Sequence, residues 1–164
     1  MISQLILGID PGLAETGYAI IEKLGSKERC LEHGTIKTKA NTPIAERLLI
    51  IHQALLELYK TYTLDACAIE QLFFNKNACS ALLVSQAVGV MTVLAAQQHV
   101  PVFFYTPLQV KQALCGHGRA EKEQIKYMLS MILNPKPLPK TSHAADAIAV
   151  GICHAAFHKV ELVK

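Results

Sequence analysis

The sequence lacks the features that direct a protein out of the reducing interior of a cell. Its five cysteines include no Cys-x-x-Cys pair, and this odd count argues against a disulfide scaffold or a structural zinc site. No basic cluster precedes the first apolar run, which Asp10 interrupts, so we expect no signal peptide. The longest apolar stretch, residues 81–96, is shorter than the roughly 18 residues that a membrane span requires. These absences predict a soluble cytoplasmic protein with no membrane contact.

Charged residues are also scarce, at 18% of the 164 residues, whereas 51% are hydrophobic. This balance excludes a disordered chain and is enough to build a sizeable core. We find no internal repeat or long linker, so we predict one domain over residues 1–164. Residues 1–70 carry 7 Lys and Arg against 9 Asp and Glu, and residues 71–140 carry 7 against 2. The second half is therefore the part suited to face a polyanion.

The apolar patterns predict three strands followed by alternating helices and strands. We expect strands at 4–10, 17–22, 30–38, 66–70 and 101–106. We expect helices at 43–62, 78–99, 108–114, 121–133 and 142–157. This order predicts an α/β fold with a mixed five-stranded sheet flanked by helices. Ligands should then bind at the carboxyl ends of the central parallel strands.

Some details of these helices can also be predicted. Thr42 and Ser142 are suited to be N-caps, and Pro43 is suited to the first helical position after Thr42. Residues 78–99 are apolar around most of the helix circumference, which indicates a helix buried in the core and in a contact between subunits.

Three carboxylates stand on hydrophobic elements. Asp10 and Glu70 each end a predicted buried strand, and Asp146 lies in the apolar last helix. Burying a carboxylate is costly unless it is paired or bound to a metal, and few basic residues are close in sequence. Oxygen ligands favour Mg²⁺ or Mn²⁺ over Zn²⁺. His143 lies three residues before Asp146, on the same helix face, and can reach the same cation. Such a cluster suits two-metal phosphodiester hydrolysis.

Each of these residues also has a simpler interpretation when taken alone. Asp10 could belong to an ordinary turn with Pro11 and Gly12, and Glu70 could be a solvated strand end. Asp146 could pair with a lysine, and His143 could be a surface residue. Only their joint placement favours the metal site.

Basic and aromatic residues suggest contacts with DNA. Lys111, Arg119 and Lys122 flank a loop with two glycines, which let the backbone approach a phosphate while the cations neutralise it. Phe73 follows Glu70 closely and is next to a second phenylalanine, so we expect one of the two rings to be exposed for stacking on a base. Lys76 is a further candidate for phosphate contact. A solvated loop and a pair of core aromatics are the alternatives.

Four motifs together resemble one family. The chain is similar, from Leu5 to about Phe157, to the RuvC family of crossover junction endodeoxyribonucleases, which have the ribonuclease H-like fold. The motifs that carry the resemblance are 7-LGIDPGL-13 with 16-TGY-18, 68-AIEQ-71 with Phe73, 110-VK-111 with the loop 116–120, Lys122 and Gln124, and 143-HAADAIA-149.

The resemblance implies a homodimer that resolves four-way (Holliday) DNA junctions in recombination and repair, by paired symmetric nicks on strands of like polarity. It implies Mg²⁺ as cofactor, two ions per active site with Mn²⁺ able to substitute, and work alongside the RuvA and RuvB proteins. Asp10, Glu70 and Asp146 match the metal-binding carboxylates of the family. His143 stands where many members carry aspartate, which leaves its role open.

The resemblance also assigns contacts with the substrate. It puts Lys111 and Lys122 close to the scissile strand and matches Phe73 to an aromatic that stacks on a base at the junction.

Three other functions fit parts of the sequence. A related nuclease could act on RNA or on RNA–DNA hybrids with the same fold. The segment 8-GIDPG-12 also resembles a phosphate loop of sugar kinases, but such enzymes need a second lobe for which this chain has no room. A DNA-binding module without catalysis would have no need of Asp10, Glu70 and Asp146.

Overall fold

A five-stranded mixed sheet forms the centre of the computed structural model, which describes residues 3–71, 78–133 and 137–158. The strand order is β3-β2-β1-β4-β5. The strands are β1 (Ser3–Asp10), β2 (Glu15–Leu24), β3 (Lys27–Lys37), β4 (Ala66–Glu70) and β5 (Val102–Tyr105). The first three pair in antiparallel fashion, and β4 runs parallel to both β1 and β5. The predicted mixed sheet is therefore confirmed.

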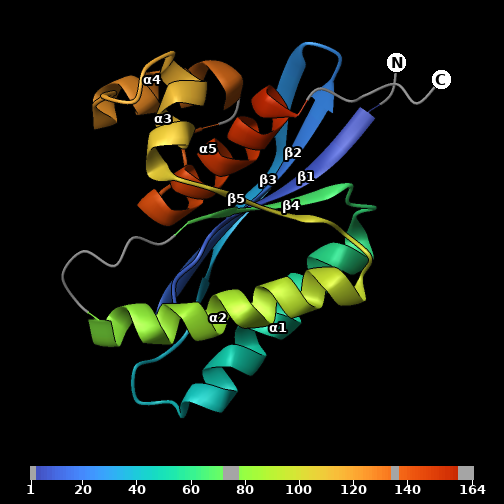
Figure 1. Ribbon diagram of the computed structural model, residues 1–164, viewed down its shortest axis with the longest axis vertical. Coiled ribbons are helices and arrows are strands. Elements are labelled where there is room, and N and C mark those ends of the chain that lie inside the picture. The colour runs from blue at the N-terminus through green and yellow to red at the C-terminus, as the bar shows by residue number, and fades with distance from the viewer. Residues whose placement is uncertain (1–2, 72–77, 134–136, 159–164) are drawn as a thin grey trace.

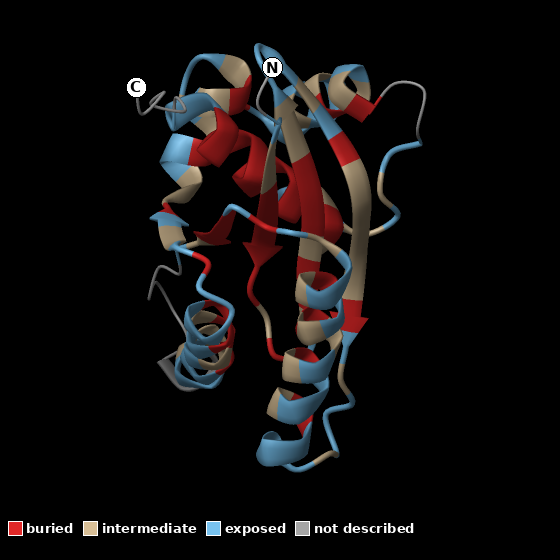
Figure 2. Ribbon diagram, turned by 90° about the vertical axis from the view of Figure 1, so that its right-hand side faces the viewer, coloured by how far each residue is buried: buried red, intermediate tan, exposed pale blue. Residues whose placement is uncertain are grey.

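Helices cover both faces of this sheet (Figure 1). They are α1 (Ile44–Thr61), α2 (Ala78–Gln97), α3 (Pro107–Cys115), α4 (Lys122–Leu133) and α5 (Ser142–Phe157). The side chains of β1 alternate between two cores, as a strand requires. Leu7 and Ile9 pack with α1 and α2, whereas Ile6 packs with α3, α4 and α5. Figure 2 shows the buried residues gathered along the strands and on the helix faces turned toward them.

The close seat of α5 on the sheet depends on glycines. A Cβ atom at Gly17 of β2 would overlap the backbone carbonyl of His143, and one at Gly8 of β1 would overlap that of Ala147. Backbone-to-backbone packing at this range is open only to residues without a side chain. The two glycines thus bring the first turns of α5, with His143 and Asp146, against β1 and β2.

Both predicted N-caps are wrong by one residue. Pro43 itself occupies the N-cap position of α1, with a ψ of 144° and no side-chain hydrogen bond, so Thr42 lies outside the helix. Thr141 caps α5, because its extended backbone lets its hydroxyl accept a 3.3 Å hydrogen bond from the Ala144 amide. Ser142 is the first helical residue instead.

Helix α2 is buried on one face only. Ala87, Met91 and Leu94 are almost fully enclosed, whereas Leu82 and Val93 are 62% and 58% exposed. The core assignment holds for the first face, and the subunit contact stays a prediction. Among the described residues, no helix combines the length and the apolar character needed to cross a membrane.

Candidate active site

Two carboxylates meet where β1 and β4 end. These strands are parallel neighbours with Ile9 opposite Ile69, so Asp10 and Glu70 follow at adjacent positions on the same sheet edge. Asp10 is buried, Glu70 is half-buried, and the two carboxyl groups are close enough for each to influence the pKa of the other. The ends of β1 and β4 therefore meet at one sheet edge, as expected from the sequence.

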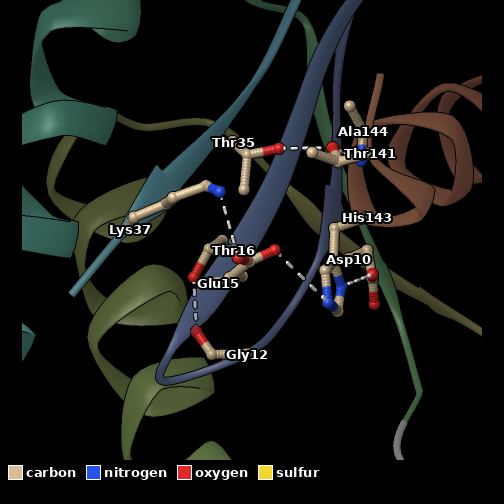
Figure 3. Close-up of polar contacts among 9 residues, drawn as sticks. All are labelled: Asp10, Gly12, Glu15, Thr16, Thr35, Lys37, Thr141, His143 and Ala144. Carbon is tan, nitrogen blue, oxygen red and sulfur yellow. Dashed lines mark hydrogen bonds and ion pairs between the residues drawn. The ribbon is translucent and has the colours of Figure 1, made fainter. Parts of the chain in front are cut away.

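The last helix adds His143 and Asp146 to this edge. The Nδ1 atom of His143 lies 2.6 Å from Oδ2 of Asp10 (Figure 3). The start of α5 is fixed by Thr141, whose hydroxyl lies 2.6 Å from that of Thr35 on β3. A helix cap and a contact with the sheet thus set the direction of the imidazole.

Glu15 is a residue of the site that the sequence did not reveal. Its carboxylate lies 3.9 Å from Nε2 of His143, on the side of the ring away from Asp10, and 3.2 Å from Nζ of Lys37 (Figure 3). The imidazole is thus placed between two carboxylates, and a lysine neutralises the outer one. No motif marks Glu15, because its role arises from the turn that folds β2 back beside β1.

The pKa of each of the three carboxyl groups is raised, and burial is the largest cause for all of them. Burial raises the pKa of Glu70 from 4.5 to about 8, and the charges of Asp10 and Asp146 add to this. Burial also raises the pKa of Asp10, although the hydrogen bond and the charge of His143 oppose the shift. For Asp146, desolvation of the carboxyl group and the charge of Asp10 raise the pKa, and His143 and Lys122 oppose them. The site therefore holds more negative charge than its protein neighbours compensate.

This donor set fits a divalent cation. Carboxylate oxygens are the ligands that Mg²⁺ and Mn²⁺ prefer, and a bound cation would compensate the cost of burying these carboxylates in their charged form. In the described part of the chain, no three Asp, Glu, His or Cys side chains are already gathered at metal-binding geometry.

Two of the residues predicted to contact DNA lie near this edge of the sheet. Lys111 lines a hollow together with Glu70 and Asp146, and Lys122 is close enough to Asp146 to influence its pKa. Arg119 is exposed, with no described contact that ties it to the site. Phe73 and Lys76 lie outside the described residues.

Comparison with known proteins decides the family. Residues 6–154 match the family model described as Crossover junction endodeoxyribonuclease RuvC. The chain belongs to the RuvC family. The RuvC of Pelotomaculum thermopropionicum is 49% identical over 152 residues, which are 93% of each chain. That of Halothermothrix orenii is 46% identical over 151 residues, which are 92% of each.

Solved structures agree with this membership. The structure described as T. thermophilus RuvC in complex with Holliday junction substrate matches with a TM-score of 0.90 and 39% identity, over 94% of both chains. The yeast mitochondrial resolvase Ydc2, at 13% identity and a TM-score of 0.68, shares the fold. The expected ribonuclease H-like fold and the expected class, a junction-resolving endonuclease of the RuvC family, are confirmed.

Proposed function

We propose that this chain resolves four-way DNA junctions by paired, symmetric nicks on strands of like polarity, in recombination and repair. The observation that carries the mechanism is the cluster of Asp10, Glu70 and Asp146, whose pKa values are all raised at one sheet edge. Ionisable groups with strongly shifted pKa values are concentrated at catalytic and ligand-binding sites.

Asp10, Glu70 and Asp146 would hold Mg²⁺, two ions per site, and Mn²⁺ could replace it. The bound cation supplies Lewis-acid stabilisation of negative charge on the phosphate and on the leaving oxygen. His143 orients Asp10 through the 2.6 Å contact and can accept or release a proton at Nδ1. Lys111 and Lys122, on the rim beside Asp146, neutralise phosphates of the cleaved strand.

The assembly follows from the symmetry of the substrate. A junction with two equivalent strands is best cut by a homodimer, and the exposed apolar face of α2 is our candidate for the subunit contact. We further propose one nuclease domain over residues 1–164, a cytoplasmic location, and work alongside the RuvA and RuvB proteins. Phe73 would stack on a base, and Lys76 and Arg119 would contact phosphates.

A substrate panel tests the proposal. The protein is incubated with a synthetic four-way junction, a linear duplex and an RNA–DNA hybrid, in Mg²⁺ or in EDTA, with Asp10→Asn as the control. Paired nicks in the junction alone, lost in EDTA and in the variant, are the expected result. Cleavage of the hybrid with the junction left intact would instead support the alternative, a nuclease of RNA or of RNA–DNA hybrids.

A further inference from the structure

A buried cation lies beside the active site with no role in the mechanism above. Arg47, in the first turn of α1, is only 9% exposed. Its Nε donates a 2.8 Å hydrogen bond to Oγ1 of Thr38. Within the described residues this is its one side-chain hydrogen bond, and no carboxylate forms an ion pair with it. A buried guanidinium is costly unless an anion accompanies it.

Arg47 lines a hollow that borders the active site. The walls come from the turn between β1 and β2, from α1, from α2 and from the start of α5. They are formed by Gly12, Leu13, Ala14, Glu15, Arg47, Leu83, Val84 and His143. His143 belongs to both places, because its ring contacts Asp10 in the active site. An occupant of this hollow would therefore lie next to the reacting centre.

The terminal N–H groups of Arg47 are open to a ligand. In the described part of the chain, the polar side-chain atoms sealed from solvent without a partner are Oε1 of Gln4 and the hydroxyl of Tyr59. The nitrogens of Arg47 are not among them, so those without a protein acceptor reach solvent. Arg47 lines this hollow, so we expect a ligand to meet these donors there.

We propose that this hollow binds a backbone phosphate adjacent to the scissile one, with Arg47 as its anchor. A guanidinium offers paired donors that match two phosphate oxygens. The one carboxylate in the hollow, Glu15, is neutralised by Lys37 at 3.2 Å, so it does not repel the anion. The apolar side chains of Leu83 and Val84 suit the sugar of the same nucleotide.

Hydrogen bonds of Thr38 connect Arg47 to the turn that follows Asp10, so a phosphate bound to Arg47 would also influence the active site. Thr38, which holds Arg47, donates from its hydroxyl to the Leu13 carbonyl at 2.5 Å and from its amide to the Ala14 carbonyl at 2.9 Å. These two carbonyls belong to the turn that follows Asp10. A phosphate on Arg47 would thus steady the segment that carries the first carboxylate.

The test measures junction binding in EDTA against salt concentration for the wild type, Arg47→Gln and Arg47→Lys. Loss of one phosphate contact should weaken binding about tenfold and reduce the salt slope by about one in Arg47→Gln, whereas Arg47→Lys keeps the slope. Junctions with a neutral methylphosphonate at each phosphate beside the cleavage point are then compared. At one of these positions, the methylphosphonate should weaken junction binding by the wild type and leave binding by Arg47→Gln unaffected.

A second pair of variants covers the case in which Arg47→Gln does not fold. Leu83→Glu puts a carboxylate at the rim of the hollow, and Gln53→Glu puts the same charge on an exposed position of α1 outside the hollow. Only Leu83→Glu should lose the sensitivity to that methylphosphonate. Equal behaviour of these two variants, or a folded Arg47→Gln with the wild-type slope and profile, would overturn the inference.

The inference rests on the proposed function, and the two fail differently. Wild-type protein that does not bind the junction would overturn both. Wild-type binding with no difference between Arg47 and its variants would overturn the inference alone.

Discussion

The imidazole of His143 and the carboxylate of Asp10 are joined through Nδ1 and Oδ2 at 2.6 Å, across 133 positions of sequence. The contact ties the end of β1 to the first turn of α5, and Gly17 of β2, which pairs with Asp10, lets the backbone of His143 approach closely enough to make it. His143 thereby forms a polar contact with the carboxylate of Asp10. The position of the imidazole ring orients this carboxylate toward the active site.

Removing a single carboxylate should abolish cleavage while preserving binding. Asp10→Asn keeps the shape of the side chain but loses the charge that a cation needs, so we expect a fall in the cleavage rate of about a hundredfold or more. Gel-shift binding to the junction should stay close to that of the wild type. A variant that cuts at the wild-type rate would exclude Asp10 from the site.

Without metal, the protein should become less stable as the pH rises. The folded state keeps the Glu70 proton up to about pH 8, whereas an unfolded glutamate with its ordinary pKa of 4.5 loses it much earlier. The unfolded state therefore binds fewer protons between these values, and the free energy of unfolding falls as the pH increases through that window.

Glu70→Gln removes this dependence. It should be more stable than the wild type by about 2 kcal/mol at pH 9 in EDTA, and nearly equal to it at pH 4.5. Urea unfolding across this range measures the difference. The matched control is Glu57→Gln, an exposed glutamate of α1, which should follow the wild type. Parallel curves for Glu70→Gln and the wild type would contradict the assignment.

Glu15 should act by orienting His143. A carboxylate behind an imidazole fixes the ring and its tautomer, so Glu15→Gln should lower the cleavage rate about tenfold. It should also shift the ¹⁵N resonances of the His143 ring. Lys37→Met leaves the Glu15 carboxylate without its partner and should move the same resonances by a smaller amount. Unchanged resonances in Glu15→Gln would mean that the 3.9 Å contact has no orienting effect.

The basic residues should differ in their effect on the rate. Lys122 opposes the rise in the pKa of Asp146, so Lys122→Ala should move the acidic limb of the pH–rate profile to higher pH. Arg119→Ala, which removes an exposed charge with no described link to the site, should leave that limb in place. Identical profiles for the two variants would refute the assignment of Lys122.

Much of the fold and the carboxylate cluster could be predicted because each depends on local patterns. Apolar runs that stop at Asp10 and Glu70 mark buried strands, and parallel strands place their carboxyl ends on one edge. The predicted N-caps of α1 and α5 were each wrong by one residue, because neighbouring residues have similar capping propensities. Tertiary contacts, such as that between Thr141 and Thr35, determine which residue caps the helix.

The remaining features of the site could not be predicted, because they depend on tertiary contacts. Glu15 meets His143 only after β2 folds back beside β1. Arg47 stands on an amphipathic helix, where a charged residue indicates a solvated face. Its burial follows from the packing of α1 against the turn after Asp10.

Mn²⁺ binding is the most direct test of a metal site formed by the three carboxylates. Mn²⁺, titrated into the wild type and followed by electron paramagnetic resonance, should bind at pH 8 and raise the melting temperature. Asp10→Asn and Glu70→Gln should each lose bound ions and much of that increase. Equal numbers of bound ions and an equal rise in melting temperature for both variants and the wild type would contradict a metal site built from these carboxylates.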